Sequence, residues 1–334
     1  MGPLVDKSKI VAVVGLGLIG GSFAKTLLER GWSVAGFDPD SNARRQGKAI
    51  GIEVFESLRD LERLDPGLVA IAGPLWTVVE SAVEIGQLTG EDCLVAEFGS
   101  VKGSIVGSLQ SLPVDFRKRF FPLHPMAGKE SSGFENSDGS LLVGAPWALV
   151  ELEDQLGLNL GRMINFLTTE FSARVFPVSG PSHDSAVSLI SQLPHLLANV
   201  LLASVGESPS RRLAFGLSAG SFRDGTRVAG TAPSRTAAMV SENSHNLHEV
   251  AAKIGAELIS SSADLKAGRE LSLFDRAGGA RVLFEEYLST MRVSQEVQMP
   301  WDDFRPWLKA LVDSGASISS LDVAEDIASV GFSR

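Results

Sequence analysis

Three glycines near the start of the chain constrain its fold more than any other feature. The segment Gly15–Gly20 reads G-L-G-L-I-G and lies between a β-rich run at residues 10–14 and helically spaced apolar residues at 18–30. A second β-rich run at residues 33–37 completes a strand–helix–strand unit of about 30 residues, the unit from which parallel sheets are built. In this context a G-x-G-x-x-G segment predicts a dinucleotide-binding turn.

Each glycine has a mechanical role in such a turn. Gly15 allows the tight turn, Gly17 lets a pyrophosphate approach the backbone, and Gly20 lets the helix pack closely on the strand. The helix that starts around Leu18 and Ile19 supplies N–H donors and the positive end of its dipole to the phosphates. We therefore predict cofactor contacts at all five positions.

An acidic residue ends the second expected strand. Asp38 is placed to accept hydrogen bonds from the adenosine ribose hydroxyls and to repel a 2′-phosphate, so the sequence favours NAD over NADP. Arg44 and Arg45 would soften that preference, but a solvated helix face is the better interpretation of them. Pro74, after the strand expected at residues 68–72, is predicted to contact the cofactor as well.

Strand and helix patterns alternate as far as residue 180. Further strands are expected at residues 93–98, 120–123, 148–150 and 173–178, and helices at 76–88, 101–112 and 156–167. Beyond that point strand signals nearly vanish, and helical patterns cover residues 182–205, 243–260, 281–296 and 301–312. The sequence therefore predicts a Rossmann-type doubly wound α/β domain at residues 1–180 and an all-α domain at 181–334. The last residues, 329–334, are expected to fray.

Composition restricts the class of protein. The chain of 334 residues is long enough for about two domains, and its formal charge of −10 argues against a nucleic-acid surface. Its one cysteine, Cys93, cannot form an intramolecular disulfide and lies in an apolar run, which fits a core residue in a reducing cytoplasm. We expect no signal peptide in residues 1–9, no apolar segment of membrane-span length, and no metal site, because the histidines are scattered.

Two strand ends carry side chains suited to proton transfer. His124 follows an apolar run and opens the segment H-P-M-A-G-K-E, in which a turn of proline and glycine precedes Glu130. Near neutral pH an imidazole there takes or gives a proton, although a structural histidine capping the turn would show the same pattern. Ser100, after the strand expected at 93–98, suits the N-cap of the next helix and can also reach the nicotinamide. A dinucleotide cofactor and a nearby base together predict a dehydrogenase.

Taken in order, five segments of the chain resemble the prephenate/arogenate dehydrogenases of tyrosine biosynthesis. They are the glycine segment 15–20, G-S-V-K at 99–102, H-P-M-A-G-x-E at 124–130, L-P-H at 193–195 and F-R-D-x-T-R at 222–227. The resemblance covers roughly residues 9–260. It implies a Rossmann domain followed by a helical dimerisation domain, the 6-phosphogluconate-dehydrogenase-like arrangement. It also implies a homodimer, to which a self-contained helical domain is the alternative.

The activity that the resemblance implies is the NAD-dependent oxidative decarboxylation of prephenate to 4-hydroxyphenylpyruvate, or of arogenate directly to tyrosine. Hydride leaves the carbinol carbon, a proton leaves its hydroxyl, and loss of CO2 makes the ring aromatic. Such a substrate requires a base for the hydroxyl and cations for its carboxylates. An NAD-binding redox sensor without catalysis is the alternative of another class. A cytoplasmic location is expected.

The resemblance also implies a role for each candidate side chain. His124 is the base that accepts the hydroxyl proton, and Ser100 contacts both His124 and the nicotinamide end. Arg227 binds the ring carboxylate, for which a guanidinium provides a bidentate grip. Glu130 interacts with Arg227 and helps to close the site, although a solvent-facing loop acid would show the same sequence.

The resemblance implies roles for two further residues, and one stretch of the chain departs from the family pattern. His195 contacts the substrate or is a satisfied core histidine, and Asp224 orients Arg227 or a loop amide. Where many family members carry an Asp-Pro-x-x-Trp-like stretch, residues 232–236 read A-P-S-R-T, so the acid and the tryptophan are replaced and Arg235 brings a charge. The helix expected at 182–205 contains no lysine, which disfavours a β-hydroxyacid dehydrogenase with a lysine base.

Overall fold

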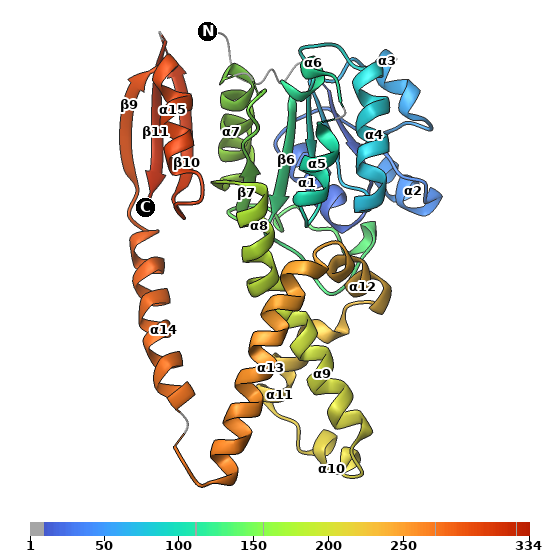
Figure 1. The fold of residues 1–334 in the computed structure, drawn as a ribbon. Coiled ribbons are helices and arrows are strands. Elements are labelled where there is room, and N and C mark those ends of the chain that lie inside the picture. The colour runs from blue at the N-terminus through green and yellow to red at the C-terminus, as the bar shows by residue number, and fades with distance from the viewer. Residues whose placement is uncertain (1–9, 111, 156, 271, 325) are drawn as a thin grey trace. The chain divides into compact units, whose positions relative to one another are not determined.

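The chain divides into two units in a computed structural model (Figure 1). Unit 1 comprises Met1–Ser182 and Ser289–Arg334, and unit 2 comprises His183–Leu288. The structure describes residues 10–334 apart from 111, 156, 271 and 325. Residues 1–9, where no signal peptide is expected, lie outside the described residues.

Unit 1 is built on a sheet whose strand order is β3-β2-β1-β4-β5-β6-β7-β8-β10-β11-β9. From β3 to β6 neighbouring strands run parallel, and the order reverses between β1 and β4, which confirms the doubly wound Rossmann topology. These strands are β1 (Val11–Val14), β2 (Val34–Phe37), β3 (Glu53–Val54), β4 (Leu68–Ile71), β5 (Leu94–Glu97) and β6 (Phe120–Pro125). The connecting helices are α1 (Leu18–Glu29), α2 (Ser41–Ala49), α3 (Leu61–Leu64), α4 (Leu75–Leu88), α5 (Gly103–Leu109) and α6 (Val114–Arg117).

An aromatic cluster fills the core on one side of this sheet. Phe23 of α1 stacks on Phe171, with ring centroids 4.8 Å apart, and Trp147 meets Phe98 edge to face at 5.3 Å. All four side chains are buried, so burial and ring contacts both stabilise this layer. Cys93 is buried as well, and burial raises the pKa of its thiol to about 12, as expected for a core residue.

The last residues of the chain return to unit 1, contrary to the prediction that the all-α domain continues to residue 334. After β7 (Pro146–Val150), α7 (Gly157–Phe171) and β8 (Arg174–Val178), the sheet continues with β10 (Ser317–Ala324), β11 (Ile327–Ser333) and β9 (Gln295–Pro300), which pair antiparallel around α15 (Trp301–Leu311). The expected helix at 281–296 therefore ends early, and the expected fraying at 329–334 is wrong, because β11 covers residues 327–333.

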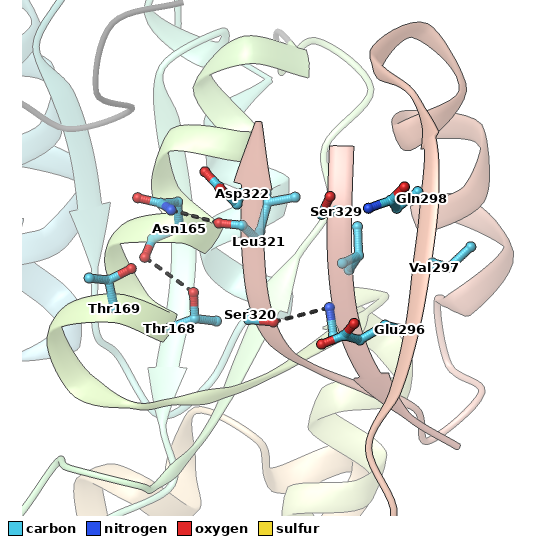
Figure 2. A pocket seen from close by; sticks show the side chains of 12 residues that line it. Asn165, Thr168, Thr169, Glu296, Val297, Gln298, Ser320, Leu321, Asp322 and Ser329 are labelled. Carbon is cyan, nitrogen blue, oxygen red and sulfur yellow. Dashed lines mark hydrogen bonds between the residues drawn. The ribbon is translucent and has the colours of Figure 1, made fainter. Parts of the chain in front are cut away.

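Long-range packing explains this difference. Ala328, Val330 and Phe332 are buried at alternate positions of β11, but the serine and the glycine between them weaken the strand signal. Trp301 packs against α7 so closely that a Cβ at Gly161 would collide with its ring. Between α7 and the C-terminal strands lies a pocket of about 460 Å³ with a mixed polar and apolar lining, shown in Figure 2. Its wall includes Asn165, which donates a hydrogen bond to the carbonyl of Leu321.

Unit 2 is helical, as the sequence predicts. A continuous helical run consists of α8 (Gly180–Val187), a π-helical turn (Ser188–Gln192) and α9 (Leu193–Glu207). It is followed by α10 (Arg211–Gly216), α11 (Gly220–Thr226), α12 (Pro233–Ser241), α13 (Ser244–Lys266) and α14 (Ser272–Thr290). The run Gly180–Glu207 is 28 residues long and, by length and composition alone, apolar enough to cross a membrane, so the expectation that no segment reaches that length is wrong.

Candidate functional site

The glycine turn has the geometry that its sequence predicts. Gly15 has φ +100°, in the region that favours glycine, and a Cβ there would lie 2.7 Å from the backbone of Ala72 and Gly73. A Cβ at Gly20 would collide with the carbonyl oxygen of Gly15, whereas Gly17 faces open space. Two of the glycines therefore permit backbone packing, and the third leaves the start of α1 accessible to a ligand.

Asp38 closes this turn from the end of β2. Its Oδ2 accepts a hydrogen bond from the Leu16 N–H at 2.7 Å, and its Oδ1 accepts one from the Asp40 N–H at 2.8 Å. Arg44 does not lie on a solvated face as predicted, because its guanidinium donates to the carbonyls of Asp38 and Pro39. Arg45 is exposed and donates to side chains of its own helix, as predicted.

These residues fit a dinucleotide. Gly17 is the N-cap of α1 and provides no side chain to occupy the N–H groups of the first turn. Leu18 and Ile19 form that turn, so the helix N-terminus can receive a pyrophosphate. Pro74 is the exposed N-cap of α4, directly after β4 on the other side of the switch point. Asp38 directly follows β2, the position at which an acid that binds the ribose is expected in this fold.

Ser100 and His124 leave the same edge of the sheet from neighbouring strands. Glu97, the last residue of β5, pairs in register with Pro122 of β6, so Ser100 lies three residues beyond this pair and His124 two residues beyond it. Both side chains are half-buried. Because carboxyl ends of parallel strands meet at one edge, these two groups share the edge with the glycine turn.

Two local expectations about these residues are wrong. The N-cap of α5 is Lys102, so Ser100 lies two residues before the cap and does not have the structural role that its sequence also suggested. Strand β6 ends at Pro125 rather than at residue 123, and His124 pairs with Ala148 of β7 inside the sheet. Glu130 follows in the loop beyond β6 and is half-buried.

A buried ion pair lies directly beneath this edge, and sequence analysis missed it. Lys102 and Glu97 have no exposed side-chain surface, and their charged groups contact each other. The sequence could have indicated this ion pair, because Glu97 ends an otherwise apolar strand and Lys102 follows two residues after Ser100. A charge inside an apolar strand predicts a buried partner.

The other predicted substrate residues belong to unit 2. His195 lies in α9, and its Nδ1 is 2.9 Å from the Ser191 carbonyl oxygen. A carbonyl only accepts, so Nδ1 carries the hydrogen and a neutral His195 presents Nε2 as an acceptor. Asp224 is exposed on α11, and Arg227 is exposed in the 3₁₀ turn Arg227–Gly230 that follows.

Unit 2 also contains a buried polar network that the sequence did not reveal. Asn243 donates to the Asp184 carbonyl at 2.8 Å and to the Gln192 side chain at 2.9 Å. Asp184 contacts the His183 ring through Oδ1 at 2.8 Å. These amide and carboxylate groups are therefore engaged within the unit.

The pocket beside the C-terminal strands does not include the predicted site. Its lining comes from α7, β9, β10 and β11, and none of the predicted catalytic or binding residues contributes to it. Within the described part of the chain, no three metal-ligating side chains gather in one place. The strand edge with Ser100 and His124 is therefore the candidate active site, because it combines a base with a cofactor cradle.

Comparison with known proteins shows the family to which the chain belongs. The prephenate dehydrogenase nucleotide-binding domain matches residues 23–176, and the prephenate dehydrogenase dimerisation domain matches residues 179–275. A cyclohexadienyl dehydrogenase of Zymomonas mobilis is 30% identical over 232 residues, which cover 67% of this chain and 78% of that protein. The chain belongs to the prephenate/arogenate dehydrogenase family.

Solved structures extend the comparison to three dimensions. A prephenate dehydrogenase from Aquifex aeolicus, in complex with hydroxyphenyl propionate and NAD+, is 27% identical and has a TM-score of 0.74. The match covers 83% of this chain and 98% of that one. A structure from Corynebacterium glutamicum is 24% identical to this chain and has a TM-score of 0.76. The two share the fold over 92% of this chain and 99% of the Corynebacterium glutamicum chain. Residues 1–288 make up less than 92% of the chain, so the match also includes part of the C-terminal strands.

Another relative is matched over a smaller share of its own length. A prephenate dehydrogenase of Lactococcus lactis is 27% identical, and the match covers 66% of this chain but 61% of that protein. The family match to the nucleotide-binding domain begins at residue 23, after the glycine segment. The assignment of that segment therefore rests on its own geometry.

Proposed function

We propose that this protein is an NAD-dependent prephenate dehydrogenase that converts prephenate to 4-hydroxyphenylpyruvate by oxidative decarboxylation. The observation that carries the proposal is the register between β5 and β6. In this register Ser100 and His124 lie at the edge of the sheet that also carries the glycine turn. The nucleotide-binding and dimerisation domains of the family support it. A redox sensor without catalysis is not favoured, because such a protein needs no base at this edge.

Each half of the chemistry has residues in place. Gly15, Gly17 and the start of α1 would hold NAD, which would supply the hydride acceptor, and Asp38 would bind its ribose. Neutral His124 accepts the proton of the substrate hydroxyl on one ring nitrogen as the carbinol carbon is oxidised, and Ser100 Oγ accepts a hydrogen bond from the N–H of the other ring nitrogen, which orients the imidazole. Loss of CO2 from the ring then follows, and aromatisation makes the step irreversible.

The residues of unit 2 are proposed to bind the substrate. Arg227 forms a bidentate ion pair with the ring carboxylate, and Asp224 orients that guanidinium. His195 presents Nε2 toward the side chain of the substrate. Glu130, in the loop after β6, helps to close the site. Hydroxyphenyl propionate, present in the Aquifex aeolicus structure, has the aromatic ring and three-carbon acid that 4-hydroxyphenylpyruvate and tyrosine share, which supports a hydroxyphenyl product.

We further infer a cytoplasmic homodimer. The helical run Gly180–Glu207 lies in the matched dimerisation domain, and its most apolar window is only 28% buried within one chain. A second copy would cover such a surface. We therefore assign the run to a subunit interface rather than to a membrane.

The decisive experiment measures formation of reduced cofactor with prephenate and with arogenate, each with NAD and with NADP. We expect prephenate with NAD to give the highest kcat/KM. His124→Asn should lower kcat by roughly 10²–10⁴-fold, the typical contribution of a general base. His245→Asn is the matched control, because that side chain is 86% exposed in unit 2. Normal turnover by folded His124→Asn would refute the assignment of the base, and a higher kcat/KM for arogenate would reassign the substrate.

A further inference from the structure

The buried pair Glu97–Lys102 connects the two strands that carry the proposed catalytic side chains. Besides contacting each other, both side chains bind backbone groups. The N–H of Gly99 donates to Glu97 Oε2 at 2.7 Å, and Lys102 Nζ donates to the carbonyl of Leu123 at 2.7 Å. A Cβ at position 99 would crowd this arrangement, since it would lie 2.6 Å from the Leu75 side chain and 2.9 Å from Glu97 Oε2.

Stability alone does not account for such a pair. Removing two charges from water costs several kcal/mol each, and replacing a buried pair with apolar residues is often neutral or stabilising. Both side chains here have 0% exposed surface. A buried pair is better explained by the geometry that it imposes, and in this protein it engages backbone groups on both sides of the site.

Each backbone group that the pair binds is adjacent to a proposed catalytic residue. Gly99 precedes Ser100, and Leu123 precedes His124. We propose that Glu97 and Lys102 are positioning residues that fix Ser100 and His124 relative to each other through these two backbone bonds. This inference rests on the proposed function, because it concerns the same site, but it assigns work to two residues that the proposed reaction does not otherwise use.

The effect on catalysis follows from the geometry of proton transfer. A base must lie within hydrogen-bond reach of the proton it removes, and a displacement of about 1 Å can lower the rate about 100-fold. Neither side chain contacts the reacting atoms in this scheme. Their loss should therefore lower kcat while the affinity for the dinucleotide, held at the glycine turn, stays the same.

Two variants isolate the bond from Lys102 to Leu123. In Glu97→Gln the new amide still accepts from the Gly99 N–H, and Lys102, charged or neutral, still donates to the carbonyl. In Glu97→Gln combined with Lys102→Met the second bond is lost, and no unpaired charge is left behind. We expect the double variant to have a kcat roughly 10–100-fold below that of the single variant, with the KM for NAD within about two-fold. If the double variant does not fold, Lys102→Leu in place of Lys102→Met provides the same comparison with another side chain that cannot donate.

A matched control removes a similar bond at the other end of the same strand. Gln155 is fully buried and donates from Nε2 to the carbonyl of Phe120 at 2.9 Å, four residues before His124. Gln155→Leu should lower stability but leave kcat within about two-fold of the wild type. An equal loss of kcat in this control would overturn the proposal, because any weakening of β6 would then explain the effect.

A readout that needs no substrate separates this proposal from the proposed function. The chain has five histidines, so the ring resonances can be resolved by NMR, and His124→Asn identifies the one that matters. The double variant should shift the His124 resonance, whereas Glu97→Gln and Gln155→Leu should leave it in place. If wild-type protein oxidises neither prephenate nor arogenate, the proposed function fails and the resonance still tests the positioning. An unmoved His124 resonance, or kcat values for the two variants that agree within about two-fold, would overturn the proposal.

Discussion

The two units bury their apolar residues to very different extents. The largest fully buried side chains, including Trp147, Phe23 and Phe171, all belong to unit 1. Among the described residues of unit 2, the buried apolar side chains are Val187, Leu193, Ala198 and Leu247. Large apolar side chains of α14 are exposed instead: Phe274, Val282, Leu283, Phe284, Tyr287 and Leu288. Since each large side chain contributes roughly 1.5–3 kcal/mol when buried, unit 1 is stabilised by its own core, whereas unit 2 leaves much of that contribution unrealised within one chain.

The chain carries its own probes for this comparison. All five tryptophans lie in unit 1, whereas the single tyrosine, Tyr287, lies on α14 of unit 2. Tryptophan fluorescence therefore follows unit 1, tyrosine emission follows α14 of unit 2, and helical circular dichroism reports the helices of both units. Two units that depend differently on assembly should give transitions that do not coincide.

The largest effect is expected from charges placed on α14. Leu283→Asp combined with Phe284→Asp puts two carboxylates on a surface that a second copy would cover, which should weaken association by two or more orders of magnitude. Sedimentation should then show a monomer, with reduced helical signal and unchanged tryptophan emission. Arg281→Gln with Glu285→Gln, an exposed pair on the same helix, is the control and should remain dimeric. A stable dimer in the aspartate variant would show that unit 2 folds without this surface.

A core substitution in unit 1 should instead change the tryptophan transition and leave the dimer intact. Phe171→Ala removes a ring that stacks on Phe23 and whose centroid lies 5.7 Å from that of Trp147. The substitution should lower the free energy of unfolding by about 3–5 kcal/mol. The tryptophan transition moves to lower denaturant while sedimentation still shows a dimer. Val114→Ala, at a 48% exposed position of the same unit, should cost less than about 0.5 kcal/mol. Equal losses in the two variants would contradict the view that unit 1 depends on its own core.

Arg227→Ala tests unit 2 as the source of substrate contacts. Loss of a charge-assisted bidentate hydrogen bond costs about 1.5–3 kcal/mol, so the KM for prephenate should rise roughly 10–150-fold. The dissociation constant for NAD, which is bound by unit 1, should not change. Arg211→Ala, also exposed in unit 2, is the control. An unchanged KM in Arg227→Ala would remove that residue from the site.

The same contrast explains what sequence could predict. The glycine turn, Asp38 and the alternating strands of unit 1 are local patterns whose physical causes lie within about 30 residues, and the structure confirms this topology. The C-terminal strands were missed because their pairing depends on contacts with α7 and β8, more than 100 residues earlier in the chain. Ser100 as a helix cap was wrong because α5 starts at Gly103.

Buried polar groups were the other source of error. Glu97 and Lys102 lie five residues apart, but their partners include the Leu123 carbonyl, which only the pairing of β5 with β6 brings near. Asp184, Gln192 and Asn243 likewise meet through helix packing. Such groups are visible in a sequence as charges or amides in apolar surroundings, but their partners come from tertiary structure.

The smallest expected effect concerns acid and the loop between β6 and β7. Hydrogen bonds from the backbone N–H and hydroxyl of Ser140, followed by the bond from Lys129, lower the pKa of Asp138 from 3.8 to about 2. The folded protein therefore binds this proton less tightly than the unfolded chain. The stabilisation is fully present above pH 3.8 and is lost as the pH falls through about 2.

Asp138→Asn should therefore be less stable than wild type near neutral pH, and the difference should shrink as the pH falls toward 2. The effect is small because the carboxylate is exposed and screened by solvent. Urea unfolding followed by tryptophan fluorescence at several pH values measures it in unit 1. Asp264→Asn, whose carboxylate pairs with Arg269 in unit 2, should leave the tryptophan transition unchanged at every pH. A gap between Asp138→Asn and wild type that stays constant from neutral pH to pH 2 would mean that the carboxylate stabilises unit 1 by packing rather than by its charge.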